Sequence, residues 1–211
     1  MKYDAVILDV DGTLWDSTPV VADVWTRAVR ESGFPGWSIT GDGLKQYFGK
    51  TMDVIAAEML PEATKEQQLS VMEKCCAYEH EGLEATDLDL CYPLVRETIK
   101  SLSQKLPVAI VSNCQAGYIE LFMKKNNLTE YITDTLCFGD NDHGKADNIR
   151  ILADRCGFKN PVYVGDTAGD LEACMDASVP MIWASYGFGS VDINRVAGVI
   201  SSFSELPEAL D

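Results

Sequence analysis

The stretch Asp9-Val10-Asp11-Gly12-Thr13-Leu14 follows a short apolar run, Ala5-Val6-Ile7-Leu8, close to the N-terminus. A continuous apolar run of this length is typical of a strand buried on both faces of a parallel sheet. Residues two apart in extended chain point to the same side, so Asp9 and Asp11 are expected to lie together where the strand ends. Two adjacent carboxylates repel each other unless a cation lies between them or one carries a proton, which favours a chemical role.

An isolated Asp-x-Asp-Gly is also compatible with an ordinary Asp-Gly turn. The chemical interpretation therefore depends on partners elsewhere in the chain.

Length and composition limit the kind of protein. A chain of 211 residues, 46% hydrophobic, suits one sizeable domain or a core that carries a smaller insertion. It contains no run of the ~20 apolar residues that a membrane helix requires. The N-terminus lacks a basic start, a long apolar stretch and a small-residue cleavage site, so we expect a cytoplasmic protein. The formal net charge of −16 disfavours nucleic acid and anionic membrane surfaces as partners.

Apolar and amphipathic segments alternate along most of the chain. Short runs rich in β-branched residues predict strands at Ala5–Leu8, Pro107–Val111, Pro161–Val164, Val179–Trp183 and Gly198–Ile200. Helical patterns fall between them, at Leu94–Lys105, Gly117–Asn126, Lys145–Cys156, Asp170–Ala177 and from Ser204 onwards. Strands separated by helices predict an α/β fold with a doubly wound, Rossmann-like parallel sheet.

Residues 16–89 contain no convincing strand. Ser17 and Pro19 are typical of a helix start, and helical patterns continue at Met52–Met59 and Lys65–Leu83. We therefore expect an inserted α-helical cap domain at 16–89 and an α/β core domain at 1–15 and 90–211.

Polar residues follow several of the predicted strands. Ser112-Asn113 ends the second apolar run, Asp166 and Asp170 follow the strand at Pro161–Val164, and Lys145 opens a predicted helix. Each alone has an ordinary explanation as a turn, a helix cap or a solvated lysine. Ligands bind beyond the carboxyl ends of strands in open parallel sheets, so their joint occurrence in this order indicates one site.

Together these motifs resemble the haloacid dehalogenase superfamily. Asp9-x-Asp11-Gly12-Thr13, Ser112-Asn113, Lys145 and Gly165-Asp166-x-x-x-Asp170 are similar to its four ordered motifs. The helical insertion resembles the cap of its small-molecule phosphatases. Tyr92-Pro93 and Tyr186-Gly187-Phe188-Gly189 are similar to the phosphoglycolate-phosphatase-like branch. The third motif departs from many relatives, which carry Pro directly after the lysine where this chain has Ala146.

The resemblance implies a Mg²⁺-dependent phosphatase that acts on small phosphorylated metabolites, of which phosphoglycolate is an example. Asp9 would be the nucleophile that forms an aspartyl-phosphate, and Asp11 the general acid and base. Asp9, the carbonyl of Asp11 and Asp166 would hold Mg²⁺.

The remaining motif residues have supporting roles by the same resemblance. Ser112, Asn113 and Lys145 would bind the transferring phosphoryl group. Asp170 would orient Lys145 or a metal-bound water. Gly12 and Thr13 would complete the phosphate loop, and Thr13 would hold the loop rather than contact substrate.

The cap segment Tyr47-Phe48-Gly49-Lys50-Thr51 resembles the specificity loop of capped relatives. We expect Lys50 and Thr51 to meet the leaving group, although Thr51 also suits a helix N-cap. Trp25 and Trp37 are expected in the cap core, and Trp15 there or at the hinge.

Other activities stay open from the sequence. The mutase branch, similar to β-phosphoglucomutase, carries a cap histidine where this chain has Val21, which disfavours a phosphotransferase. A phosphonatase would need a cap lysine, for which Lys45 and Lys50 are available. A pyrophosphatase, or a non-catalytic phosphate- or metal-binding protein, is a further alternative, but a pure binder does not need Asp11. We expect a monomer or a weak homodimer.

Overall fold

The computed structural model describes residues 1–211. Its centre is a six-stranded parallel sheet in the order β3-β2-β1-β4-β5-β6. The strands are β1 (Ala5–Leu8), β2 (Val108–Ser112), β3 (Asp134–Cys137), β4 (Pro161–Gly165), β5 (Met181–Ala184) and β6 (Gly198–Ile200). Five of them match predicted strands, and the α/β class with a doubly wound parallel sheet is confirmed. The strand order reverses at β1, so the carboxyl ends of β1, β2 and β4 form a topological switch point.

The sequence analysis missed β3. Only Leu136 and Cys137 of its four residues are buried, and the strand pairs on one side alone, with β2. A short edge strand with a half-polar sequence has no apolar run to reveal it.

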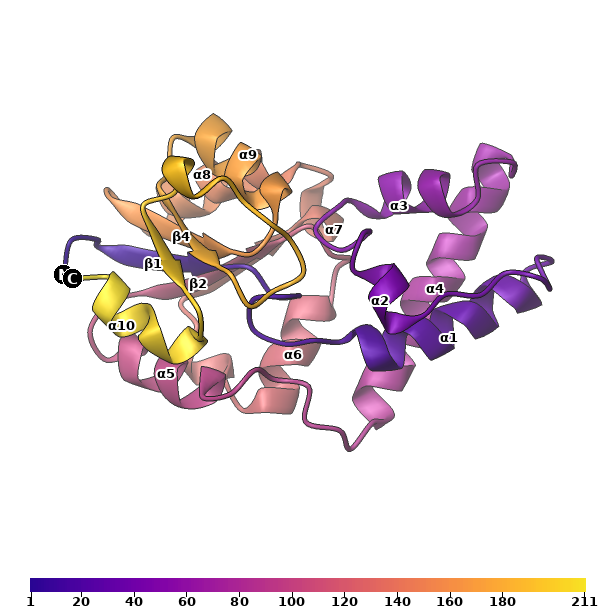
Figure 1. The fold of residues 1–211 in the computed structure, drawn as a ribbon, viewed down its shortest axis with the longest axis horizontal. Coiled ribbons are helices and arrows are strands. Elements are labelled where there is room, and N and C mark those ends of the chain that lie inside the picture. The colour runs from indigo at the N-terminus through magenta and orange to yellow at the C-terminus, as the bar shows by residue number, and fades with distance from the viewer.

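Helices cover both faces of the sheet (Figure 1). One face packs against α5 (Val95–Ser103), α6 (Tyr118–Asn126) and α10 (Leu206–Ala209), and the other against α8 (Lys145–Cys156) and α9 (Ala168–Ala177). Val6 and Leu8 of β1 belong to the first hydrophobic cluster and Ile7 to the second, as the period of two requires. A short helix, α7 (Phe138–Asn141), follows β3.

Residues 16–89 form only helices and loops, and we call them the helical insertion. The helices are α1 (Thr18–Glu31), α2 (Gly41–Leu44), α3 (Met52–Met59) and α4 (Lys65–Ala85). Val21 and Trp25 of α1 and Cys75 and Leu83 of α4 are fully buried within it. In Figure 1 the insertion stands beside the sheet, to the right. The division of the chain into two domains stays a prediction.

Two connecting segments join the insertion to the sheet, and they lie side by side. Trp15 forms an antiparallel bridge with Cys91. The amide of Asp16 donates to the carbonyl of Leu90 at 2.8 Å, and that of Tyr92 to the carbonyl of Leu14 at 3.0 Å. The chain therefore enters and leaves the insertion through a hydrogen-bonded pair of segments.

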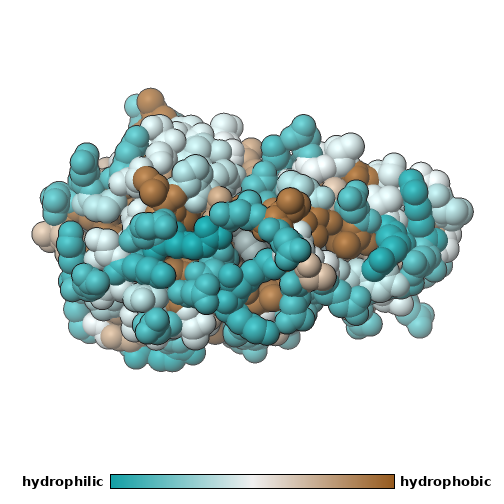
Figure 2. Space-filling model, turned by 90° about the horizontal axis from the view of Figure 1, so that it is seen from below, coloured by the Kyte–Doolittle hydropathy of each residue, from teal (hydrophilic) through white to brown (hydrophobic).

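The surface is mostly polar on the face shown in Figure 2. Figure 2 shows a face dominated by hydrophilic residues, with hydrophobic residues exposed in smaller patches between them. Among the helices of this chain, none combines the length and the apolar character needed to cross a membrane.

Candidate active site

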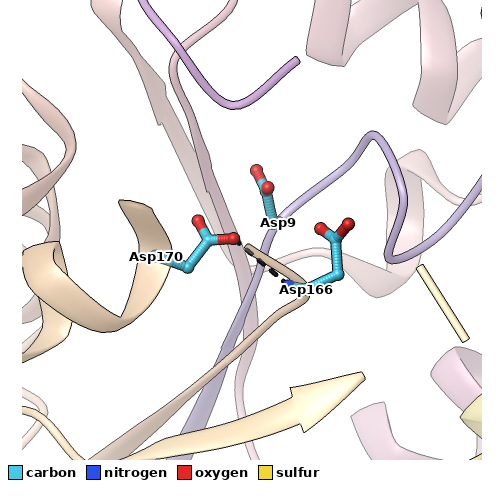
Figure 3. Close-up of side chains that lie close together, drawn as sticks. All are labelled: Asp9, Asp166 and Asp170. Atoms are coloured by element: carbon cyan, nitrogen blue, oxygen red, sulfur yellow. Dashed lines mark hydrogen bonds between the residues drawn. The ribbon is translucent and has the colours of Figure 1, made fainter. Parts of the chain in front are cut away.

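Three aspartates converge at the carboxyl ends of β1 and β4 (Figure 3). Asp9 directly follows β1, Asp166 directly follows β4, and Asp170 lies in the first turn of α9. One carboxylate oxygen of each lies within 4.8 Å of those of the other two, and all three residues are buried. Three acidic oxygens at this spacing in the interior need positive charge between or beside them.

Part of that charge comes from Lys145, the first residue of α8. Its ammonium lies 3.1 Å from Asp9 Oδ1 and 2.5 Å from Asp170 Oδ1, and all three side chains are at most 3% exposed. Burial acts to lower the pKa of Lys145, but Asp170 and Asp9 outweigh it and raise the pKa above its ordinary value. The lysine is therefore charged, and its charge is shared between two carboxylates.

The remaining donors of this group fit a hard divalent cation. Asp9 Oδ1 accepts no hydrogen bond, because Lys145 approaches it in ion-pair range without hydrogen-bond geometry. Asp170 Oδ2 is already engaged by the amides of Asp166 and Thr167. Carboxylate oxygens are the ligands that Mg²⁺ prefers, and Asp9 and Asp166 each offer one within the cluster.

Backbone glycines hold the carboxylate of Asp166 from two sides. A Cβ atom at Gly12, whose φ is +77°, or at Gly187 would collide with this carboxylate. The amide of Phe188 donates to Asp166 Oδ2 at 2.7 Å, and the hydroxyl of Thr13 donates to Oδ1 at 3.3 Å. Gly12 and Thr13 therefore position Asp166, and the expected roles of Gly12 and Thr13 toward the phosphate stay predictions.

Asp11 points away from these three aspartates. Its Oδ1 accepts hydrogen bonds from Ser17 Oγ at 2.6 Å, Tyr118 Oη at 2.7 Å and Trp15 Nε1 at 3.1 Å. Burial raises the pKa of Asp11 to about 7, against the lowering effect of Ser17 and Tyr118 and with a smaller raising effect of Asp9. The carboxylate of Asp11 is thus poised to exchange a proton near neutral pH.

The surroundings of Asp9 differ from those of Asp11. Burial raises the pKa of Asp9 to about 6, and Lys145 and the hydroxyl of Ser112 act in the opposite direction. Two neighbouring carboxylates with different environments are the arrangement in which one acts as nucleophile and the other as acid.

The helical insertion closes over this site through Gly49. The side-chain amide of Asn113 donates to the carbonyl of Gly49 at 2.9 Å. Gly49 has a φ of +89°, and a Cβ there would lie 3.3 Å from Thr167 Oγ1. Asn113 therefore links the sheet to the insertion, in addition to its expected place beside the phosphate.

The two cap residues expected to meet the leaving group differ in position. Lys50 lines a cavity over Asp9 and Asp11, but its ammonium pairs with Glu58 at 2.6 Å near the surface. Thr51 is the N-cap residue of α3 and does not line that cavity. Trp25 is buried in the insertion as expected, whereas Trp37 is only partly buried.

Several residues of the site were missed in the sequence. The wall of the cavity over Asp9 and Asp11 also includes Glu79, Gln115 and Tyr118. Glu79 lies on α4 at a helical spacing from the buried Cys75 and Leu83, so an acid on an apolar helix face was the available signal. No local signal marks Tyr118, whose role depends on contacts across 107 residues.

Comparison with known proteins agrees with this geometry. The family model described as haloacid dehalogenase-like hydrolase matches residues 6–184, and the chain belongs to this family. The chain is 27% identical to the phosphoglycolate phosphatase of Vibrio vulnificus over 197 residues, which cover 87% of this chain and 84% of that protein. It is 23% identical to the Escherichia coli phosphoglycolate phosphatase over 234 residues, with coverage of 97% and 91%.

Solved structures show the same fold. A predicted phosphoglycolate phosphatase from Haemophilus somnus superimposes with a TM-score of 0.87 at 19% identity, over 100% of this chain and 99% of that chain. A haloacid dehalogenase-like family hydrolase from Streptococcus pneumoniae gives a TM-score of 0.84 at 17% identity, with coverage of 100% and 99%. The predicted family is therefore confirmed, and with it the prediction of an enzyme of the phosphatase class.

Proposed function

We propose that this protein is a Mg²⁺-dependent phosphatase that hydrolyses phosphomonoesters of small metabolites through an aspartyl-phosphate. The observation that carries the proposal is the pair Asp9 and Asp11. They lie two residues apart and line the same cavity, yet Asp9 contacts Lys145 at 3.1 Å, while Asp11 accepts three hydrogen bonds from Ser17, Tyr118 and Trp15.

Asp9 supplies the nucleophile. Its Oδ1 is buried and accepts no hydrogen bond, so a lone pair is available to attack phosphorus. Lys145 lies beside the same oxygen and would attract the equatorial oxygens of the phosphoryl group. Asp170 holds the ammonium of Lys145 at 2.5 Å and thereby fixes its direction.

Ser112 and Asn113 complete the phosphate site. Both lie at the carboxyl end of β2, the strand beside β1, and both line the same cavity as Asp9. Their hydroxyl and backbone groups suit a transferring phosphoryl group.

Asp11 transfers the protons. With a pKa of about 7 it is protonated often enough near neutral pH to donate a proton to the departing alkoxide. After that step Asp11 is ionised, and the carboxylate can accept a proton from the water that attacks the aspartyl-phosphate. Ser17, Trp15 and Tyr118 keep it turned toward the cavity rather than toward Asp166.

Asp9 and Asp166, with the backbone carbonyl of Asp11, would hold Mg²⁺. When bound, the ion supplies positive charge that neutralises the phosphate oxygens and lowers the repulsion between nucleophile and substrate. The family resemblance is the reason for including the backbone carbonyl of Asp11. The carboxylate of Asp11 does not belong to the cluster formed by Asp9, Asp166 and Asp170.

The helical insertion would act as the cap, and the protein would work in the cytoplasm as a monomer or weak homodimer. Phosphoglycolate, the compound in the names of the Vibrio and Escherichia coli relatives, is one member of the proposed substrate class.

A burst experiment tests the proposal. p-Nitrophenyl phosphate has a good leaving group that needs little protonation, so Asp11→Asn should release about one equivalent of p-nitrophenolate rapidly and then turn over slowly. Asp9→Asn should release none, and wild type should turn over steadily with Mg²⁺ and not with excess chelator. Wild-type protein that hydrolyses no phosphoester, phosphonate or pyrophosphate would instead favour a non-catalytic binder. Isomerisation of a sugar phosphate without phosphate release would favour a mutase.

A further inference from the structure

A buried acid of the helical insertion faces the proposed active site, and the chemistry described so far leaves it unused. Glu79 of α4 is 4% exposed and lines the cavity that Asp9 and Asp11 also line. Its Oε2 accepts from Trp25 Nε1 at 2.6 Å, and its Oε1 accepts from Gln115 Nε2 at 3.1 Å. A buried acid held from both the insertion and the sheet is costly unless it has a task there.

Around Glu79, the side-chain hydrogen-bond donors have partners, whereas two of the acceptors have none. The side-chain donors of Trp25, Asn113, Gln115 and Tyr118 all donate within the protein. The acceptors Asn113 Oδ1 and Gln115 Oε1 are buried and have no hydrogen-bond partner. The side-chain nitrogen of Asn113 donates to the carbonyl of Gly49, and that of Gln115 donates to Glu79. These two hydrogen bonds fix the orientation of both amides, so their oxygens are left for a ligand.

Positive charge is also scarce in this cavity. Lys50 is the one cationic residue in its wall, and the ammonium of Lys50 is paired with Glu58 at 2.6 Å. Lys145 is engaged by Asp9 and Asp170 below the cavity. A carboxylate placed beside Glu79 would meet acceptors and no free cation, and burying an unpaired charge in that way is strongly unfavourable.

We propose that Glu79, together with Gln115 and Asn113, determines which leaving groups are accepted; this inference rests on the proposed phosphatase function. The three residues favour a leaving group that donates hydrogen bonds through a hydroxyl or an ammonium group, and they disfavour one that carries a carboxylate. Donors on the leaving group would satisfy the unpartnered oxygens that the cavity presents.

The protonation of Glu79 does not remove the discrimination. Burial raises the pKa of Glu79 to about 8, against the lowering effect of Gln115 and with a raising effect of Asp11. A protonated Glu79 offers one O–H and no positive charge, which is too little for a substrate carboxylate with two acceptor oxygens.

Three phosphates of equal length test the proposal, because they differ only in the group that would reach Glu79. They are 2-hydroxyethyl phosphate, 2-aminoethyl phosphate and 2-phosphoglycolate. Rates of phosphate release by wild-type protein with Mg²⁺ give kcat/KM for each. Calorimetry with Asp9→Asn gives the three affinities without turnover. We expect kcat/KM and affinity to be at least tenfold higher for 2-hydroxyethyl phosphate or 2-aminoethyl phosphate than for 2-phosphoglycolate. Comparison of the first two esters identifies which donor is preferred.

Variants assign the preference to Glu79. Above about pH 8, where Glu79 is ionised, Glu79→Gln replaces a carboxylate oxygen by an N–H donor, so the preference over 2-phosphoglycolate should fall at least tenfold. Glu81→Gln, an exposed neighbour on the same helix, should leave it unchanged. If Glu79→Gln does not fold, the wild-type ratios still decide.

Two results would overturn the inference: 2-phosphoglycolate handled as well as the donor-bearing esters, or a preference unchanged in Glu79→Gln. Failure of the phosphatase function is a separate result. In that case wild type would hydrolyse neither these esters nor p-nitrophenyl phosphate, and the order of affinities would still test Glu79.

Discussion

The ammonium of Lys145 lies 3.1 Å from the carboxylate of Asp9, although 136 positions separate them in the chain and both side chains are at most 3% exposed. The contact arises because β1 and α8 bring their ends to the same edge of the sheet. It neutralises part of the charge of a buried acidic cluster and places a cation where a phosphoryl group would lie.

Replacement of this lysine should damage both stability and activity. In Lys145→Met, the carboxylates of Asp9 and Asp170 lose their shared cation, and breaking a buried ion pair from one side costs about 3–5 kcal/mol of unfolding free energy. Loss of one electrostatic donor to the transition state should lower kcat by about 10²–10³. Denaturant unfolding without metal and steady-state kinetics measure the two effects. Lys105→Met, at an exposed position, serves as the control, and activity within tenfold of wild type in Lys145→Met would contradict the role of Lys145.

The pH dependence should report Asp11. Its pKa is raised to about 7 chiefly by burial, so kcat/KM should fall as the pH rises through this value and the proton donor is lost. The hydroxyl of Tyr118 favours the ionised form of Asp11. Tyr118→Phe should therefore move the basic limb to higher pH. Tyr131→Phe, the control, should leave the basic limb of the kcat/KM profile in place. A basic limb that moves to lower pH in Tyr118→Phe would refute its assignment to Asp11.

The glycine beside Asp166 should control Mg²⁺ affinity. A Cβ at Gly187 collides with the Asp166 carboxylate and with the carbonyl of Gly12. Gly187→Ala should displace this ligand and raise the Mg²⁺ concentration needed for half-maximal activity by about 10–100-fold, the range typical of lost ligand support. Gly36→Ala, where a Cβ meets nothing within 4 Å, should titrate like wild type. Equal titration of both variants would show that the position of Asp166 does not govern the metal.

Stability should also depend on the titration of Glu79. Burial raises the pKa of Glu79 from 4.5 to about 8, so the folded state holds this proton more tightly than the unfolded state. The resulting contribution to stability is fully present below the unfolded value and is lost as the pH rises through the folded one. Wild type should therefore lose more unfolding free energy than Glu79→Gln between about pH 5 and pH 9. Denaturant unfolding across this range checks the sign, and parallel curves would argue against a buried, proton-binding Glu79.

The sequence was sufficient for the parts of the site that follow strand geometry. Asp9 and Asp166 could be placed because apolar runs mark the strands that precede them, and parallel strands end at one edge. Lys145 opens a helix, and its place followed from the order of the motifs in the family resemblance. Tyr118 and Glu79 could not, because their relation to Asp11 depends on how α6 and α4 pack against the sheet. Strand β3 was missed for a different reason, since half of its residues are not buried.

The paired segments at Trp15 and Cys91 have a mechanical consequence for the insertion. Two short strands joined by backbone hydrogen bonds resist stretching and sliding along their length, but they bend and twist readily. Any relative movement would therefore approximate a rotation about one axis through these segments, as in hinge closure. Asp11 and Ser17 lie close to these segments in the chain and would move little, while Gly49 and Glu79 lie farther along the insertion and would move farther. Substrate entry would then release the groups that recognise the alcohol and leave the groups that handle the phosphate in place.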